Sequence, residues 1–153
     1  MLYFEDLQIG VVSKFGRYAV TREEMIEFAS KYDPQAFHLD DDAAAKTHFG
    51  RLSASGWHTC AMTMAMLVEN MQANKQAGLG SPGMDNLRWV KPVFAGDVLR
   101  CETEILSKRR SASRREMGLF KSSCTVFNQN DEPVLTMVSN AMILVRNPEI
   151  SDS

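Results

Sequence analysis

Apolar residues recur along this chain with two different spacings, which separate predicted helices from predicted strands. Between Thr21 and Tyr32, and again from Gly56 to about Asn74, they repeat every three or four positions, which is the spacing of an amphipathic helix. Thr21 is followed three residues later by Glu24, a capping-box pattern that marks a helix start. The second segment is the longest helical signal. Its apolar residues cover more than one face, so we expect that helix to be largely buried.

The second half of the chain is rich in valine, threonine, phenylalanine and isoleucine. We expect strands near 13–20, 83–90, 97–107, 117–128 and 133–146. Residues 128–131 form a turn cluster between two of these strands, and links this short imply an antiparallel meander. A sheet that follows one apolar helix can bury the surface of that helix only by curving around it. The expected fold class is α+β, with an antiparallel β-sheet wrapped around a long central helix.

Length, charge and cysteine content indicate what kind of protein this is. The 153 residues, 44% of them hydrophobic, fit one domain over 1–153 with a polar tail from about 147. A net charge of −2 gives no general attraction to nucleic acid or to an anionic membrane, and no apolar run reaches the ~20 residues of a spanning helix. The N-terminus does not resemble a secretory signal. Cys60, Cys101 and Cys124 have no paired spacing, so we expect a cytoplasmic protein without a disulfide framework or zinc site.

Asp33 and His38 lie in a short stretch that cannot be helical. Pro34 lacks a backbone donor and pushes the residue before it out of the helical region, so the first helix should end here. Asp33 and His38 then sit on an irregular loop, where catalytic groups often lie. Each alone would more often be a turn former or a satisfied polar group. Together they form a candidate acid/base pair.

Three aspartates, Asp40 to Asp42, follow this loop and precede three alanines. Negative charge is favourable at the start of a helix, so a short capped helix explains them. A calcium loop would need alternating oxygen ligands and a distal glutamate, and neither occurs at that spacing. We therefore expect no metal site.

The start of the long helix is a second candidate for chemistry. Ser55 is a suitable N-cap, and it lacks the flanking glycine pattern of a nucleophile elbow. Gly56 would present a backbone N–H without an intrahelical acceptor at the positive end of the helix dipole, which could hold an oxyanion. Glycine would also let a substrate approach closely. Farther along are Met62, Met64, Met66 and Met71, a flexible apolar set that fits a core or an acyl-chain groove.

Five positive charges fall within eight residues, from Lys108 to Arg115, at a predicted hairpin. The simpler interpretation is a solvated loop. The alternative is a contact of Arg109 and Arg110 with the phosphates of a ligand or with an acidic protein. No nucleic-acid-binding motif accompanies these charges.

From about residue 13 to 145 the sequence resembles the MaoC-like dehydratases, or (R)-specific enoyl-CoA hydratases. The family motif is an aspartate, an asparagine two residues on and a histidine five residues on, followed by a glycine that opens the central helix. The chain matches at Asp33, His38 and Gly56. It departs at Gln35, where the family has asparagine, at Ala36, where the family usually has proline, and at Met64, where some hydratases carry serine. Further agreeing dipeptides are Phe49-Gly50, Lys91-Pro92 and Gly96-Asp97.

The resemblance implies a hot-dog fold, a homodimer or dimer of dimers, and addition of water to a 2-enoyl thioester or the reverse dehydration of an (R)-3-hydroxyacyl thioester. The substrate would carry coenzyme A or a carrier protein, with no metal or redox cofactor. Asp33, with a pKa raised by a largely apolar pocket, would take and return protons, His38 would orient the water, and the Gly56 N–H would meet the thioester oxygen. The expected substrate contacts are Gln35, Phe37, Ser55, Trp57, His58, Met64, Arg109 and Arg110. A hot-dog thioesterase and a non-catalytic acyl-thioester binder are the alternatives.

Overall fold

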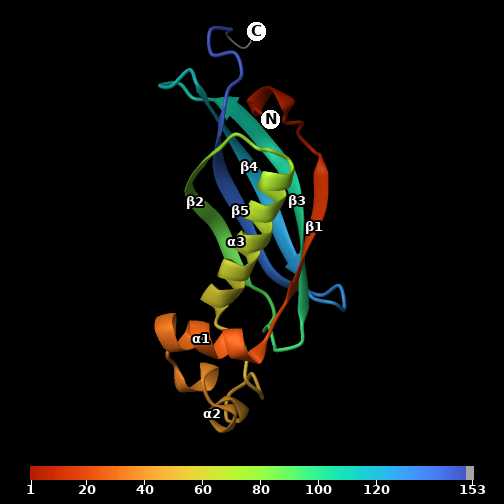
Figure 1. Ribbon diagram of the computed structural model, residues 1–153, viewed down its shortest axis with the longest axis vertical. Coiled ribbons are helices and arrows are strands. Elements are labelled where there is room, and N and C mark those ends of the chain that lie inside the picture. Colours follow the sequence, from red (N-terminus) through yellow and green to blue (C-terminus); the bar gives the residue numbers. More distant parts are fainter. Residues whose placement is uncertain (151–153) are drawn as a thin grey trace.

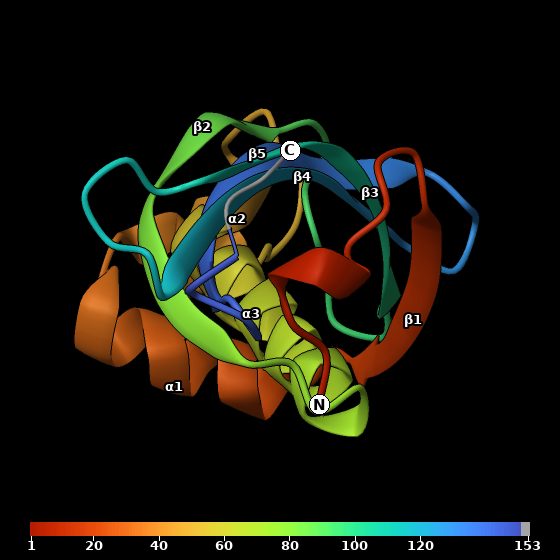
Figure 2. The ribbon, with the colours of Figure 1, turned by 90° about the horizontal axis from the view of Figure 1, so that it is seen from above.

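An antiparallel sheet curves around one long helix in the computed structural model, which describes residues 1–150 (Figures 1 and 2). The strands are β1 (Val12–Ala19), β2 (Gly78–Trp89), β3 (Val98–Arg110), β4 (Met117–Phe127) and β5 (Pro133–Leu144). They lie in the order β1-β3-β4-β5-β2, and each neighbouring pair is antiparallel. The helix α3 (Gly56–Ala73) lies on the concave side of the sheet (Figure 2). The predicted α+β class and hot-dog fold are confirmed.

The shorter helical elements gather at the two ends of the sheet. Helix α1 (Arg22–Tyr32), the turn η2 (Ala36–His38) and helix α2 (Asp41–Ala45) lie near the first residue of α3 (Figure 1). The turn η1 (Phe4–Asp6) and the β3–β4 hairpin lie at the opposite end. Among the described residues, no helix combines the length and apolar character needed to cross a bilayer. Of the tail expected from about 147, residues 151–153 lie outside the described part.

Strand β2 differs most from its prediction, because it begins at Gly78 rather than near residue 83. Its first half is rich in glycine and contains Pro82, both of which have low strand propensity. Pairing with β5 holds this segment extended, with Gly78 opposite Ile143 and shifts of register on either side of Gly80. Tertiary pairing therefore overrides local propensity here.

One face of α3 packs into the hydrophobic core, whereas the opposite face is exposed. Met62 and Met66 are 1% and 2% exposed against the sheet. On the other side, Trp57, Met64 and Val68 are 58%, 42% and 38% exposed. The expectation of a largely buried helix is wrong for this second face, because the sheet curves around only one side of α3.

Strand β1 comes very close to α3 at Gly16. The φ angle of Gly16 is +89°, and a Cβ added there would lie 2.6 Å from Met66 Sδ. The register of β1 against β3 shifts between Phe15 and Tyr18, so the strand is irregular at this contact. Burying a methionine side chain contributes about 1.5–3 kcal/mol. The missing side chain at Gly16 therefore allows β1 to pack directly on the core face of α3.

We expect Gly16→Ala to lower the free energy of unfolding by about 2–4 kcal/mol, because it combines positive-φ strain with overpacking against Met66. Gly10→Ala is the matched control, since Gly10 has a φ of +87° and no atom within 4 Å of its added Cβ. It should cost only the backbone strain, about 1–2 kcal/mol. Urea unfolding of both variants measures the difference. Equal losses would show that the Met66 contact does not require glycine.

Candidate active site

The loop between α1 and α2 brings Asp33 and His38 together, as predicted. Helix α1 ends at Tyr32, Asp33 leaves the helical conformation before Pro34, and His38 ends η2. His38 Nε2 lies 3.5 Å from Asp33 Oδ2. The side chains of His38 and Asp33 are 6% and 16% exposed, so the pair is largely shielded from bulk solvent.

The backbone selects the tautomer of His38. Its Nδ1 lies 2.9 Å from the carbonyl oxygen of Ser53, which can only accept, so Nδ1 carries the hydrogen. In the neutral ring, Nε2 therefore directs a lone pair toward the Asp33 carboxylate. A molecule that donates two hydrogen bonds, such as water, can satisfy both acceptors at once. The pair is arranged to hold and orient such a molecule.

Two side-chain donors fix the Asp33 carboxylate. The Ser55 hydroxyl donates to Oδ2 at 2.7 Å, and Gln35 Nε2 donates to Oδ1 at 2.6 Å. Burial by itself raises the pKa of Asp33, but the hydrogen bonds from Ser55 and Gln35, together with His38, outweigh it and hold the pKa below its ordinary value. The expected raised pKa is wrong, because the surroundings of this carboxylate are polar. Asp33 is ionised at neutral pH.

Ser55 joins this loop to α3. It occupies the N-cap position, but its side chain makes no capping hydrogen bond, so the prediction of a side-chain cap is wrong. Its buried hydroxyl serves Asp33 instead. Gly56 follows as the first residue of α3, where its N–H has no intrahelical acceptor. The predicted oxyanion donor is thereby connected to the acid/base pair through Ser55.

Aromatic residues flank both parts of this site. The Phe37 ring lies 4.6 Å from the His38 ring and packs against it. On the far side of Gly56, Trp57 meets Trp89 edge-on at 5.2 Å, and Trp89 Nε1 donates to the Gly56 carbonyl oxygen at 2.8 Å. Phe37 and Trp57 were among the substrate contacts expected from the sequence. Trp89 was not, because no local pattern relates it to the start of α3.

A cavity of about 710 Å³ lies between the sheet and the farther part of α3. Much of its wall is apolar, including Phe15, Met64, Leu67, Met71, Met84 and Met142. Two of the four methionines considered as a groove, Met64 and Met71, thus line an open space, whereas Met62 and Met66 belong to the core. Met64 is about 12 Å along the helix axis from Gly56, at a rise of 1.5 Å per residue.

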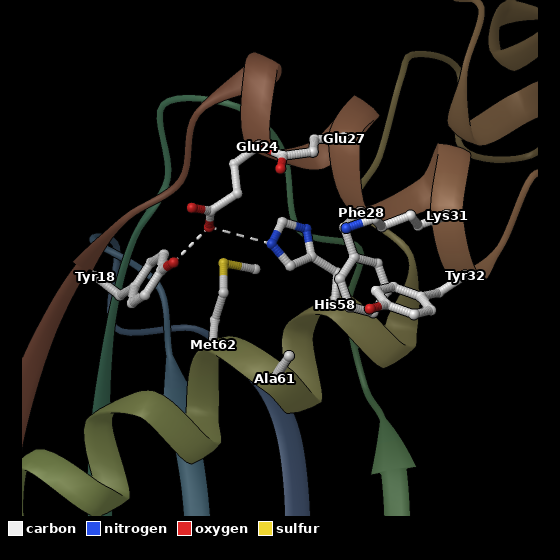
Figure 3. Close-up of a pocket in the computed structure, with 9 residues that line it drawn as sticks. All are labelled: Tyr18, Glu24, Glu27, Phe28, Lys31, Tyr32, His58, Ala61 and Met62. Atoms are coloured by element: carbon white, nitrogen blue, oxygen red, sulfur yellow. Dashed lines mark hydrogen bonds and ion pairs between the residues drawn. The ribbon is translucent and has the colours of Figure 1, made fainter.

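A smaller cavity of about 280 Å³ lies beside α1 and is lined by His58 (Figure 3). Glu24 Oε1 accepts a hydrogen bond from the Tyr18 hydroxyl and lies 3.3 Å from His58 Nε2. The Phe28 ring stacks on the imidazole at 4.7 Å. His58 therefore lines this cavity and bonds to Glu24, and no contact joins it to Asp33.

The Tyr18, Glu24 and His58 side chains form a coupled polar cluster. Burial holds the pKa of His58 below its ordinary value although Glu24 acts in the opposite direction. The hydrogen bond to Glu24 is the main reason that the pKa of Tyr18 is raised to about 12. His58 is therefore neutral at pH 7 and donates from Nε2, while its buried Nδ1 has no hydrogen-bond partner among the described residues.

The sequence did not reveal this cluster, because Glu24 was assigned to a capping box. Half of that box forms: Thr21 Oγ1 accepts the Glu24 N–H at 3.3 Å. The Glu24 carboxylate turns instead to Tyr18 and His58, which come from β1 and α3. The local motif therefore predicted the Thr21 cap correctly, whereas tertiary contacts determine the partners of the Glu24 carboxylate.

Arg109 and Arg110 lie on the β3–β4 hairpin, at the end of the sheet opposite α1 and α2 (Figure 1). Arg110 donates to the Pro148 carbonyl oxygen at 3.2 Å, and the neighbouring Lys108 Nζ donates to the Leu7 carbonyl oxygen at 2.7 Å. These cations tie the hairpin to the two terminal segments. Within one chain, the structure does not bring the hairpin to the predicted acid/base pair.

Within residues 1–150, no three histidine, cysteine, aspartate or glutamate side chains gather in a way that could hold a metal ion. Cys60, Cys101 and Cys124 are free thiols.

Comparison with known proteins assigns this arrangement to a family. The family model described as "MaoC like domain" matches residues 7–125. The chain belongs to this family. The MaoC-like dehydratase from Rhodospirillum rubrum has a crystal structure that matches with a TM-score of 0.87 and 35% identity, over 95% of this chain and 99% of that one.

Two further relatives have names that state an enzymatic activity. The 3-hydroxybutyryl-CoA dehydratase of Methylorubrum extorquens is 27% identical over 99% of this chain and 89% of its own. The (R)-hydratase from A. caviae involved in PHA biosynthesis shares the fold, with a TM-score of 0.69 and 21% identity over 92% of this chain and 99% of that one. Membership in the MaoC-like family supports a hydratase or dehydratase.

We expect the His58 cluster to make folding less stable in acid. Burial lowers the pKa of folded His58, so the unfolded chain takes up the proton first, near the ordinary value of 6.5, and stability falls as the pH drops below it. His58→Gln keeps a donor toward Glu24 but cannot titrate, so it should remove this part of the decrease. Melting temperatures of both proteins between about pH 7.5 and about pH 5 measure the effect. If the melting temperatures of the two proteins fell in parallel with pH, His58 would not be the source of the acid sensitivity.

Proposed function

We propose that this chain adds water to a trans-2-enoyl thioester, or removes it from an (R)-3-hydroxyacyl thioester. The observation that carries this proposal is the pairing of Asp33 Oδ2 with His38 Nε2 at 3.5 Å, two atoms that both accept hydrogen bonds when the imidazole is neutral. A water that donates one hydrogen to each would have its oxygen lone pairs free to meet a bound double bond. The ionised Asp33 can accept one of those hydrogens.

In the hydration direction, the water oxygen bonds to Cβ of the enoyl group while Asp33 takes a proton from the water. The π electrons shift toward the thioester, and its oxygen gains negative charge. The Gly56 N–H, at the positive end of the α3 dipole, would donate to that oxygen. Asp33 then returns its proton to Cα, and His38 holds the water throughout. No electrons are gained or lost, so the proposed reaction needs no redox cofactor, and in this proposal protein groups alone move the proton and stabilise the oxygen.

The proposed substrate is an acyl-CoA, with an acyl-carrier-protein thioester as the other carrier. The coenzyme A thioester in the name of the Methylorubrum relative supports this choice. The cavity of about 710 Å³ offers flexible methionine walls to an acyl chain, and methionine adapts well to irregular apolar ligands. The three free thiols support a reducing cytoplasm as the proposed location.

We further propose a homodimer that buries the outer edge of β2 and the exposed face of α3. β2 ends the sheet, so its outer edge has no strand partner within residues 1–150. Leu79 on β2, and Trp57 and Val68 on α3, are large apolar side chains that remain exposed and do not line the large cavity. An exposed edge strand beside such side chains is a typical protein interface.

The homodimer predicts a mass of twice 17.2 kDa by light scattering. Leu79→Asp should shift the protein toward the monomer, because it places a charge in the interface. Asn130→Asp, on an exposed residue of the turn between β4 and β5, away from β2 and α3, is the matched charge control and should leave the mass unchanged. A monomeric wild-type protein would rule out this interface.

Hydration of crotonyl-CoA tests the proposed reaction. Asp33→Asn should lower kcat by ~10²–10⁴ with the fold intact, because the proton carrier is lost while the core is untouched. His38→Ala should lower it by a similar factor. Loss of the conjugated thioester absorbance, with the thioester intact, measures hydration. Release of free thiol would instead identify a thioesterase, and no reaction would leave an acyl-thioester binder.

Asp42→Asn is the control for loss of a carboxylate, since Asp42 is exposed on the neighbouring α2, and it should leave kcat unchanged. The acid/base roles would be untenable if both Asp33→Asn and His38→Ala kept more than about a tenth of the wild-type kcat.

A further inference from the structure

Trp89 is carried by a firmly held part of the sheet. It is the last residue of β2, and its backbone pairs with Leu135 of β5, which is fully buried. Directly after it, the Val90 N–H donates to the Val134 carbonyl oxygen at 2.9 Å. The indole therefore projects from a fixed backbone.

The indole contacts Gly56 in two ways. Its Nε1–H donates to the Gly56 carbonyl oxygen at 2.8 Å. Its ring also covers the Gly56 Cα, because a Cβ added at Gly56 would lie 2.6 Å from Trp89 Cε2 and 2.8 Å from Nε1. Real Cβ atoms do not approach other atoms so closely. Position 56 must therefore be glycine for a reason within the protein, separate from the approach of a substrate.

These contacts hold the start of α3 from the side of the sheet. The Gly56 carbonyl has two lone pairs, so it can accept from Trp89 as well as from the helix. On the other side of Gly56, the Ser55 hydroxyl is bonded to Asp33. The Gly56 carbonyl is thus tied to the sheet, and the side chain of the preceding Ser55 is tied to the acid/base loop.

We infer that Trp89 is a positioning residue, which sets the place and orientation of the first-turn N–H groups of α3 relative to Asp33. This inference rests on the proposed function, in which the Gly56 N–H donates to the thioester oxygen. Trp89 is 45% exposed, so it is not a core side chain with mainly a packing role. Its hydrogen bond and its contact with Gly56 are the features that tie it to the site.

Trp89→Phe keeps an aromatic ring but removes the donor to Gly56. We expect kcat for crotonyl-CoA hydration to fall about tenfold, less than the ~10²–10³ for loss of an oxyanion donor, because the N–H remains but is less well placed. KM should change less than about twofold, since ground-state binding is unaltered. The melting temperature should stay within about 2 °C, as befits a half-exposed residue. Val90→Ala, the next residue and also exposed, is the control and should match the wild type.

A double-mutant cycle tests the steric half of the inference. Gly56→Ala should lower the melting temperature by about 3 °C or more, because its methyl group displaces the indole. In a Trp89→Leu background, the same Gly56→Ala change should have less than about half that effect, since the ring is gone. Light scattering of each variant checks that the oligomeric state is unchanged.

The outcomes separate this inference from the proposed function. If the wild-type protein hydrates crotonyl-CoA and Trp89→Phe keeps its full kcat, the positioning role is overturned and the proposed function stands. A fall in kcat that only matches a large fall in melting temperature also overturns it. If the wild-type protein does not hydrate, the proposed function and the positioning role both fail. In every case, equal effects of Gly56→Ala with and without Trp89 overturn the steric explanation for glycine.

Discussion

The hydrogen bond from Ser55 to Asp33 is the interaction on which the site depends most. It is the direct link between the loop that carries the acid/base pair and the helix start that carries the free N–H groups. Ser55 is fully buried, so a hydroxyl without this partner would cost about 1–3 kcal/mol. Because the Ser55 hydroxyl is used in this bond, α3 starts without a side-chain cap. The same bond helps to hold the pKa of Asp33 below its ordinary value, although burial alone raises it.

Local chemistry predicted the elements and the position of the acid/base pair. Pro34 ends α1, which leaves Asp33 and His38 on a loop, and alternating strands with short turns give the antiparallel sheet. The unpredicted features depend on contacts between distant segments. The Glu24 carboxylate meets His58, and Trp89 covers Gly56, through bonds that join different elements. Periodicity and capping patterns carry no information about such partners, so these roles required the three-dimensional structure.

Two of the three departures from the family pattern, Gln35 and Met64, lie in different surroundings. Gln35 stands where the family has asparagine, yet its amide still donates to Asp33 at 2.6 Å, so the longer side chain keeps the carboxylate anchored. Met64 stands where some hydratases carry serine, and it lines the large cavity rather than the acid/base pair. The first departure preserves the chemistry in the proposed reaction, and the second bears on the shape of the space for the acyl chain.

Helix α1 is held at both of its ends. Near its first turn, Arg22 forms a bidentate pair with Asp41 at 2.9 and 2.8 Å, and Glu24 bonds across to His58. At its last turn, Asp33 is bonded to Ser55. A lid-like swing of this segment would break all three polar contacts, two of which are partly buried. Turnover in the proposed reaction should then be paced by bond making or by departure of the product, and substrates should meet a site that is already assembled.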